Sequence, residues 1–366
     1  MIGGMRPDRR PDRLAALRRR LGERGVDALL VTHLPNIRYL TGFSGSAGML
    51  LVDAERSVLV TDSRYSIQAP AEAHGAAAVE IEPVNLWDRL RLVLTGRGVR
   101  SLGFESDRLT VSGAERLQGV WPGRLEPVVG TVEELRAVKD AGEIEAIRQA
   151  VALAQEALAV VLETIRVGQT ERQIAARLEA ELRGRGGEWH PFPTIVGSGP
   201  RTALPHAEAS NRVVGAGDLL LLDFGARLEG YCSDLTRTVV VGADPTDRQR
   251  EVHGAVLGAQ RAAFAALAAG RTGSEVDEAT RSALAGAGFG AGIRHSTGHG
   301  IGLELHEEPR LARSVDNPVY PGAVVTVEPG VYLEGWGGIR IEDDVVVRAG
   351  GAEYLSAPSH ELLVVR

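Results

Sequence analysis

Five side chains in the second half of the sequence have the residue types and surroundings of metal ligands. They are Asp223, Asp234, His299, Glu328 and Glu342. Each acid lies in or beside an apolar run typical of β-strands, such as Leu-Leu-Asp-Phe-Gly around the first acid and Thr-Val-Glu-Pro-Gly around the third. A lone carboxylate buried in such a run costs several kcal/mol or changes its pKa until it is neutral. The acids are therefore expected to be paired or to bind a metal ion.

Two of the acids are predicted to meet across a hairpin. The apolar runs 219–226 and 231–241 flank a short polar segment. A hairpin centred immediately after Leu228 places Asp223 directly opposite Asp234. The Cβ atoms of directly opposed residues lie ~5 Å apart, and like charges there destabilise a sheet.

The other two acids are predicted to meet in the same way. The runs 324–328 and 339–347 flank a glycine-rich turn. A hairpin centred on Gly335 places Glu328 opposite Glu342. Two pairs of opposed carboxylates in one domain require a compensating cation.

The donor set indicates which metal this would be. Four carboxylates and one imidazole are enough ligands for two divalent ions bridged by carboxylates. Oxygen-rich sites suit Mn²⁺, and a site with one imidazole also suits Co²⁺ or Zn²⁺. Two ions ~3.5–4 Å apart can hold a bridging water and lower its pKa from ~15.7 toward ~7. The single cysteine, Cys232, excludes a disulfide within the chain and a cysteine-based zinc cluster.

The whole chain has the composition of a globular protein, with 44% hydrophobic and 24% charged residues. Its 366 residues are long for one hydrophobic core, so two domains are expected. The net charge of −7 gives no broad cationic surface for nucleic acid or anionic lipid. No apolar run reaches the ~18 residues needed to span a membrane. Residues 1–21 are rich in arginine and lack the apolar stretch of a secretory signal, so a cytoplasmic protein is expected.

The sequence predicts two domains, 1–132 and 133–366. Short strands alternate with helices in the first, which is typical of a small α/β domain. The second opens with a long amphipathic helix from Glu143, followed by a capping box that begins at Thr170. The other predicted elements are strands at 26–32, 49–52, 57–61, 79–83 and 102–105, helices at 64–73, 249–268 and from Ser274, and a final block of strands.

Six segments of the sequence form a recognisable set. They are Asn36–Ser46 (Asn-Ile-Arg-Tyr-Leu-Thr-Gly-Phe-Ser-Gly-Ser), Leu222–Gly225, Ser233–Arg237, Ser296–Glu307, Val327–Gly330 and Gly338–Asp343. With them the chain resembles the pita-bread metallopeptidases, and among these the Xaa-Pro peptidases prolidase and aminopeptidase P. The resemblance covers nearly the whole chain. It implies an α+β fold, in which a pita-bread catalytic domain with a curved sheet backed by helices follows a smaller N-terminal α/β domain of the creatinase/prolidase type. It also implies a homodimer.

The resemblance implies roles for residues around the metal ligands. His206 and His306 match the two histidines that bond the substrate carbonyl or the developing oxyanion. Glu328 matches the residue that passes a proton to the leaving proline nitrogen. Arg340 is expected to orient an acidic ligand near the substrate, and Arg310 to hold the terminal carboxylate of the substrate.

The implied reaction is hydrolysis of the peptide bond before proline by a dinuclear metal centre. Two alternatives remain open within the family: a dipeptidase that closes the site beyond proline, and an aminopeptidase P that admits longer peptides. Arg310 and the short chain favour the dipeptidase. A more distant alternative is a non-enzymatic pita-bread binding protein, which predicts lost metal ligands, whereas all five are present.

Overall fold

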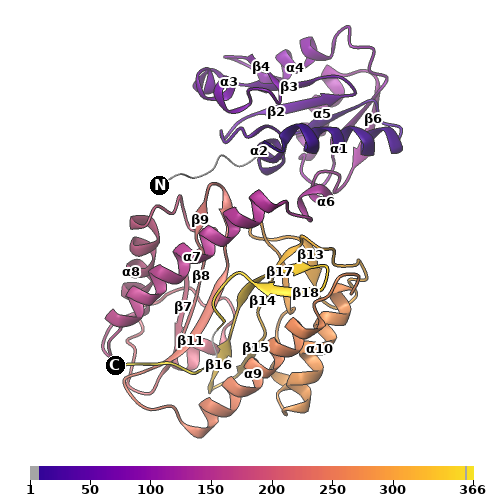
Figure 1. Cartoon of the computed structure of the whole chain (residues 1–366). Coiled ribbons are helices and arrows are strands. Elements are labelled where there is room, and N and C mark those ends of the chain that lie inside the picture. The colour runs from indigo at the N-terminus through magenta and orange to yellow at the C-terminus, as the bar shows by residue number, and fades with distance from the viewer. Residues whose placement is uncertain (1–7, 359–360) are drawn as a thin grey trace. The chain divides into compact units, whose positions relative to one another are not determined.

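The computed structural model describes residues 8–358 and 361–366. The chain divides into two compact units, Met1–Arg136 and Ala137–Arg366. Each unit has its own sheets and its own covering helices (Figure 1).

The first unit is built on a mixed six-stranded sheet with the order β4-β3-β2-β1-β5-β6. The strand pairs β1–β5, β3–β4 and β5–β6 are parallel, and β1–β2 and β2–β3 are antiparallel. The strands are β1 (Ala28–Val31), β2 (Met49–Asp53), β3 (Ser57–Thr61), β4 (Ala78–Ile81), β5 (Ser101–Glu105) and β6 (Arg124–Val128). The helices are α1 (Arg10–Glu23), α2 (Leu34–Thr41), α3 (Gln68–Glu72), α4 (Leu86–Leu94), α5 (Val111–Val120) and α6 (Glu133–Arg136), with a 3₁₀ turn at Ser63–Tyr65.

The helix predicted at 64–73 is only partly present. The structure has the 3₁₀ turn and then the short helix α3 in its place. Pro70 gives the reason, because it has no N–H to bond a carbonyl one turn earlier. A helix that begins at Gln68 has Pro70 in its first turn, where the missing N–H costs nothing.

The first unit ends after α6, at Arg136, whereas the boundary predicted from the sequence follows residue 132. Two hydrogen bonds explain the difference. Asn36 Nδ2 donates to Glu133 Oε1 at 2.8 Å, and Arg136 Nη1 donates to Asn36 Oδ1 at 2.7 Å. The side chain of Arg136 is buried, so α6 belongs to the core of the first unit.

The second unit contains two main sheets and two short hairpins. The four-stranded sheet has the order β19-β11-β8-β7, and the five-stranded sheet has the order β13-β12-β14-β17-β18. An isolated bridge between Thr236 and Glu342 joins them. The strands are β7 (Ile195–Ser198), β8 (Leu219–Phe224), β9 (Arg227–Leu228), β10 (Tyr231–Cys232), β11 (Leu235–Val241), β12 (Gly298–Gly300), β13 (Glu307–Leu311), β14 (Val324–Val327), β15 (Gly330–Leu333), β16 (Gly337–Arg340), β17 (Asp343–Arg348), β18 (Gly351–Tyr354) and β19 (Val364–Val365).

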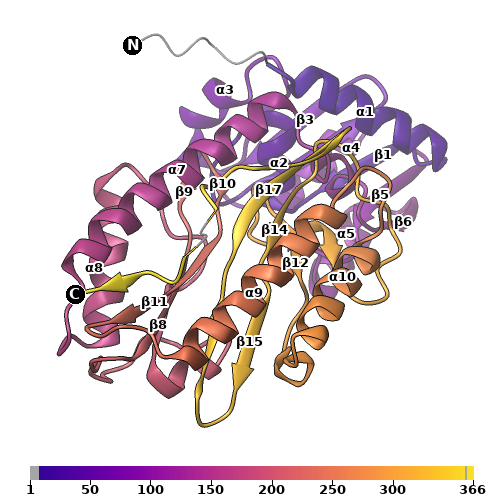
Figure 2. The same ribbon diagram turned by 60° about the horizontal axis from the view of Figure 1, so that its bottom comes forward.

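Four long helices back these sheets. They are α7 (Ala141–Thr164), α8 (Glu171–Gly184), α9 (Asp247–Ala266) and α10 (Gly273–Gly286). Helices α7 and α8 pack on β8 and β11, while α9 and α10 pack on the strands of the other sheet (Figures 1 and 2). The capping box expected at Thr170 is confirmed. Helix α10 is capped by Thr272, not opened by Ser274, because the Thr272 side chain accepts the bond from Glu275 N. Within the described residues, no helix is long and apolar enough to cross a membrane.

The predicted register of the first hairpin is wrong: Asp223 faces a residue two positions further along the chain than Asp234. Its two-residue turn is Glu229-Gly230, with φ of 50° and 82°, as a type I′ turn requires. This turn pairs Tyr231 with Leu228, and the same register continues into β8 and β11. Thr236 therefore lies opposite Asp223. Asp234, two residues before Thr236, is a diagonal neighbour of Asp223 on the same face.

The predicted register of the second hairpin is confirmed. Gly330 pairs with Arg340 in β15–β16, and Val327 pairs with Asp343 in β14–β17. Both ladders follow one register. The residues between them, Glu328 and Glu342, therefore occupy facing positions.

Candidate metal centre and active site

A cavity of about 730 Å³ lies in the second unit. The structure brings to its wall all five predicted metal ligands and three of the four supporting residues. Arg310 of β13, the fourth, is outside this lining. The predicted residues in the wall are Asp223, Asp234, His299, Glu328, Glu342, His206, His306 and Arg340.

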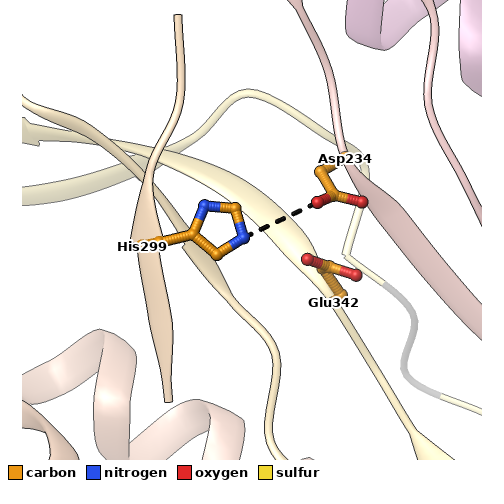
Figure 3. A group of neighbouring side chains, drawn as sticks. All are labelled: Asp234, His299 and Glu342. Atoms are coloured by element: carbon orange, nitrogen blue, oxygen red, sulfur yellow. Dashed lines mark ion pairs between the residues drawn. The ribbon is translucent and has the colours of Figure 1, made fainter. Parts of the chain in front are cut away.

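Three of the ligands form a compact group (Figure 3). One ligand atom each from Asp234, His299 and Glu342 lies within 4.8 Å of the others. His299 Nε2 is 3.7 Å from Asp234 Oδ2, which is too long for a hydrogen bond. Ligand atoms bound at ~2.0–2.2 Å to one ion lie roughly 3–4 Å from each other. The spacing of this group therefore suits a single ion between them.

Glycines allow His299 to occupy this position. A Cβ on Gly298 would collide with the carbonyl oxygen of Thr326 in β14, and a Cβ on Gly300 with that of Glu308 in β13. Both flanking residues must therefore be glycine for β12 to fit between its two neighbours.

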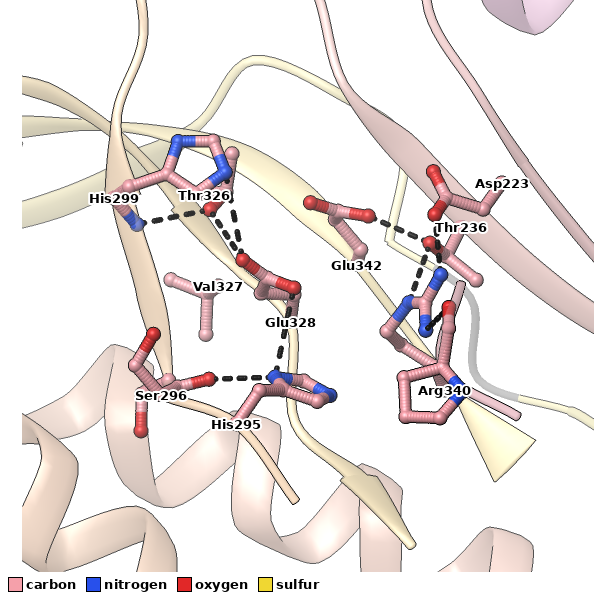
Figure 4. A network of polar contacts seen from close by, with 12 residues as sticks. Asp223, Thr236, His295, Ser296, His299, Thr326, Val327, Glu328, Arg340 and Glu342 are labelled. Atoms are coloured by element: carbon pink, nitrogen blue, oxygen red, sulfur yellow. Dashed lines mark hydrogen bonds and ion pairs between the residues drawn. The ribbon is translucent and has the colours of Figure 1, made fainter. Parts of the chain in front are cut away.

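Glu328 lies beside the same histidine (Figure 4). Its Oε1 is 3.5 Å from His299 Nε2 and accepts a hydrogen bond from Thr326 Oγ1 at 3.3 Å. Its Oε2 is 3.7 Å from His295 Nδ1. The backbone N–H of Glu328 donates to Thr297 O at 2.8 Å, which fixes the residue just beyond the end of β14.

Arg340 orients two of the acids from the opposite wall (Figure 4). Its Nη2 forms an ion pair with Asp223 Oδ2. Its Nε donates to Thr236 Oγ1 at 3.0 Å, and this hydroxyl donates to Glu342 Oε2 at 2.6 Å. Burial alone would lower the pKa of Arg340, but Tyr332 and the neighbouring acids raise it well above its usual range. The guanidinium therefore stays charged.

The carboxylates cannot all be ionised together without a cation. Burial raises the pKa of Asp234, Glu342 and Asp223, and the charges of neighbouring acids raise those of Asp234 and Glu342 further. Burial likewise raises the pKa of Glu328 to about 8. Only one positively charged side chain, Arg340, is paired with an acid of this group among the described residues.

These residues fit divalent metal ions. Asp223 Oδ1 and Asp234 Oδ1 are buried, and neither has a hydrogen-bond partner within the described part of the chain. Such orphaned oxygens are rare in folded proteins and indicate a missing ligand. Burial lowers the pKa of His299 to about 3, so its ring is neutral and has a lone pair for a metal. Cys232 is no ligand here, because burial raises the pKa of its thiol to about 12.

The supporting histidines lie on the exposed side of the cavity. The rings of His306 and His299 meet edge to face, with centroids 4.2 Å apart. His206 lies on the loop that follows the 3₁₀ turn Gly199–Ala203. Arg310 is exposed. Burial lowers the pKa of His306 and His299, and the positive charge of Arg310 lowers both further.

Two further residues of the site were not predicted. His295 lines the cavity and forms hydrogen bonds with Tyr332 Oη at 2.7 Å and Ser296 O at 2.8 Å. Tyr332 Oη also accepts from Arg340 Nη1 at 2.6 Å. The sequence held a weak signal for Tyr332, which shares a strand face with Gly330 near Glu328, and none for His295, because a four-residue spacing from His299 places no two residues together in a loop and strand.

Two family models together match most of the chain. The model of metallopeptidase family M24 matches residues 145–349, and that of the creatinase/prolidase N-terminal domain matches residues 13–138. The chain belongs to metallopeptidase family M24. The predicted family, the pita-bread fold and the preceding creatinase-type domain are thereby confirmed, and the family is one of metal-dependent peptidases.

Relatives with known structures cover almost the whole chain. A structure of "Xaa-Pro dipeptidase from Bacillus anthracis" is 39% identical with a TM-score of 0.94, and covers 97% of this chain and 99% of its own. An "X-Pro aminopeptidase" structure from Thermotoga maritima is also 39% identical, with a TM-score of 0.89 and coverage of 96% and 99%. A "Xaa-Pro dipeptidase" of Pyrococcus horikoshii is 34% identical over 94% of this chain and 96% of its own. Identity alone therefore does not separate the two peptidase types.

Proposed function

We propose that the chain is a metal-dependent Xaa-Pro dipeptidase, which hydrolyses the bond between an N-terminal residue and proline. The observation that carries the proposal is the convergence of three buried carboxylates, the half-buried Glu328 and a neutral imidazole on one cavity, with two orphaned carboxylate oxygens. Relatives named Xaa-Pro dipeptidase support the substrate class. The proposed ligands of two divalent ions are Asp223, Asp234, His299, Glu328 and Glu342.

The residues around the cavity have different roles in the proposed hydrolysis. Bound divalent ions would supply Lewis-acid chemistry, polarising the peptide carbonyl and acidifying water. His206 and His306 donate hydrogen bonds to the carbonyl oxygen as negative charge develops there; one such donor contributes about 10²–10³-fold in kcat. Glu328 transfers a proton to the proline nitrogen as the bond breaks. Arg340 holds Asp223 and, through Thr236, Glu342 in place.

The role of Glu328 rests on its position between two histidines at the cavity wall. Glu328→Gln should lower kcat for Ala-Pro by about 10²–10⁴-fold at saturating metal, because an amide cannot transfer the proton. Metal content is measured in parallel, since Glu328 is also a proposed ligand. Glu334→Gln, an exposed change on the same hairpin, is the control and should keep wild-type turnover. A folded, metal-loaded Glu328→Gln protein with full activity would refute the role.

The length of the substrate is tested at Arg310. If its guanidinium holds the free carboxylate of proline, Arg310→Ala should raise KM for Ala-Pro by about 10–100-fold, as expected for a hydrogen bond to a charged group. Turnover of Ala-Pro amide, which has no carboxylate, should not change. Arg313→Ala, an exposed arginine just after β13, is the matched control.

The second candidate is an Xaa-Pro aminopeptidase, which the similarity to the Thermotoga maritima structure favours. It predicts that Ala-Pro-Ala is cleaved at least as fast as Ala-Pro. The dipeptidase predicts the reverse, so turnover of the two substrates decides between them. Metal analysis of the purified protein separates both from a non-enzymatic binding protein.

Manganese as the native metal, a homodimer and a cytoplasmic location stay predictions. Activity reconstituted with Mn²⁺, Co²⁺ and Zn²⁺ in turn tests the first. The sedimentation mass of the purified chain tests the second.

A further inference from the structure

Glu171 is a buried carboxylate outside the metal site. It is the first residue of α8, and its exposed fraction is 0%. The capping box of this helix uses its neighbours: Thr170 Oγ1 accepts from Gln173 N, and Gln173 Oε1 accepts from Thr170 N. The carboxylate of Glu171 is therefore not part of the capping box, and its hydrogen bonds go to other residues.

Both oxygens of Glu171 accept hydrogen bonds from the loop 198–210, which is distant from Glu171 in the sequence. Oε1 accepts from the N–H and the hydroxyl of Ser198, both at 2.8 Å. Oε2 accepts from the N–H of Ser210 at 2.9 Å and from its hydroxyl at 2.6 Å. Arg201 Nε donates to both oxygens, at 3.1 Å to Oε2 and at 3.3 Å to Oε1. Burial alone would raise the pKa of Glu171, but the bonds from Ser210 and Ser198 outweigh it and lower the pKa, so the group is ionised.

The two serines are the ends of the loop that carries His206. Ser198 is the last residue of β7 and pairs with Leu220 of β8, the strand that carries Asp223. Ser210 is the last residue of the loop, and its carbonyl accepts from Arg172 N at 3.1 Å. One carboxylate thus joins the sheet side of the loop to its outgoing end.

Other contacts hold the loop at different points. Its 3₁₀ turn is tied to β16, because Thr202 Oγ1 accepts from Gly338 N at 2.7 Å. Pro205 O accepts from Arg340 Nη1 at 3.1 Å, directly before His206. A bridge joins Ile195 to Glu208. These bonds fix the inner part of the loop. Its two ends are joined by Glu171 and also by Arg212, whose Nη1 donates to Ser198 Oγ at 2.6 Å and whose backbone N–H donates to Ser210 Oγ at 3.0 Å.

We propose that Glu171 is a positioning residue, which closes the base of the 198–210 loop and so holds His206 at the distance from the metal centre that catalysis needs. The proposal rests on the function proposed above for His206. A misplacement of about 1 Å in a catalytic group can cost ~10²-fold in rate. By bonding both serines, the carboxylate of Glu171 thereby sets the position of His206, which lies between them in the loop.

The test is Glu171→Gln in the metal-loaded full-length protein. The amide nitrogen of glutamine must face the backbone N–H of Ser198 or of Ser210, and two donors cannot bond. Glu171 then no longer holds one end of the loop. We expect kcat for Ala-Pro to fall by about 10–100-fold with unchanged metal content. Peptides within 199–210 should exchange their amide hydrogens faster than in the wild type.

A double-mutant cycle with His206→Ala distinguishes positioning from general structural support. If Glu171 acts through His206, Glu171→Gln/His206→Ala should be no slower than His206→Ala alone. Losses that multiply would overturn the proposal, as would a kcat of Glu171→Gln within about twofold of the wild type. Glu143→Gln is the matched control, because Glu143 is also buried in the first turn of a helix but bonds Tyr231 and Asp140. It should change neither kcat nor exchange in 199–210.

Two further results keep the test decisive. If Glu171→Gln does not fold, Ser210→Ala removes the hydroxyl that donates to Glu171 Oε2 at 2.6 Å and accepts from Arg212 N at 3.0 Å, and should lower kcat by about two- to tenfold. This loss should vanish in the His206→Ala background, and its persistence would overturn the proposal. A wild type without Ala-Pro turnover would instead refute the proposed function, and hydrogen exchange would still show whether Glu171 closes the loop.

Discussion

Removal of the metal ions should make the stability of the protein fall as the pH rises. Without a cation, burial raises the pKa of Glu328 from 4.5 to about 8. Burial and neighbouring acids also raise the pKa of Asp234 and Glu342 well above their usual range. The folded state then keeps protons that the unfolded chain releases. The free energy of unfolding therefore decreases as pH rises from the ordinary pKa to the raised one.

Glu328 alone gives the size of the effect. A group with a pKa of 4.5 in the unfolded chain and about 8 in the folded chain costs about 1 kcal/mol of stability between pH 7 and pH 8.5. This window avoids the histidines. Burial lowers the pKa of His295 to about 4 and that of His299 to about 3, so their effect lies below the ordinary value of 6.5 and has the opposite sign. Asp234 and Glu342 add to the loss in the same direction.

Urea unfolding of the chelator-treated protein at pH 7 and pH 8.5 measures this loss. Glu328→Gln is the control, because its amide does not titrate, and its loss between the two pH values should be smaller by about 1 kcal/mol. The comparison of two variants also removes any contribution of the first unit. Returned Mn²⁺ should abolish the decline, since metal binding requires ionised ligands. The reasoning fails if the metal-free wild type and Glu328→Gln lose stability equally.

Two more changes test the charges of the site. Arg340→Met should lower the free energy of unfolding by about 3–5 kcal/mol, because it leaves Asp223 buried without its partner; calorimetry measures it, and Arg366→Met, which breaks the exposed pair with Asp244, should cost less than about 1 kcal/mol. Asp234→Asn should remove most of the stabilisation that saturating Mn²⁺ confers, which is about 2.7 kcal/mol at a hundredfold excess over Kd; a thermal shift equal to that of the wild type would show that Asp234 is not a ligand.

The metal site could be predicted because its chemistry conflicts with its surroundings. Acids in apolar runs are visible without a structure, and the glycine-rich turn at Gly335 gave the correct register for Glu328 and Glu342. The register predicted for the first hairpin was wrong because its turn is Glu229-Gly230. Glu229 adopts a positive φ that is uncommon outside glycine, so the sequence signal for the turn was weak.

Parts of the fold were hidden by composition. Helix α1 has buried leucines at 14, 17 and 21, a helical spacing, but arginines surround them and obscure the pattern. The contacts of Glu171 could not be predicted at all, because its partners Ser198 and Ser210 are 27 and 39 residues away. Such bonds depend on how strands and helices pack in three dimensions, and local sequence patterns do not predict them.

The charge of Arg340 bears on the number of metal ions. Four carboxylates balance two divalent ions, but the ion pair of Arg340 with Asp223 adds one positive charge to the same wall. With a neutral His299, two ions would leave the site with a net charge of about +1, which suits an anionic group such as hydroxide or the carboxylate of a substrate. One ion would leave it negative and would repel both. We therefore expect two ions per active chain, and a fully active protein with one ion at saturating metal would contradict this count.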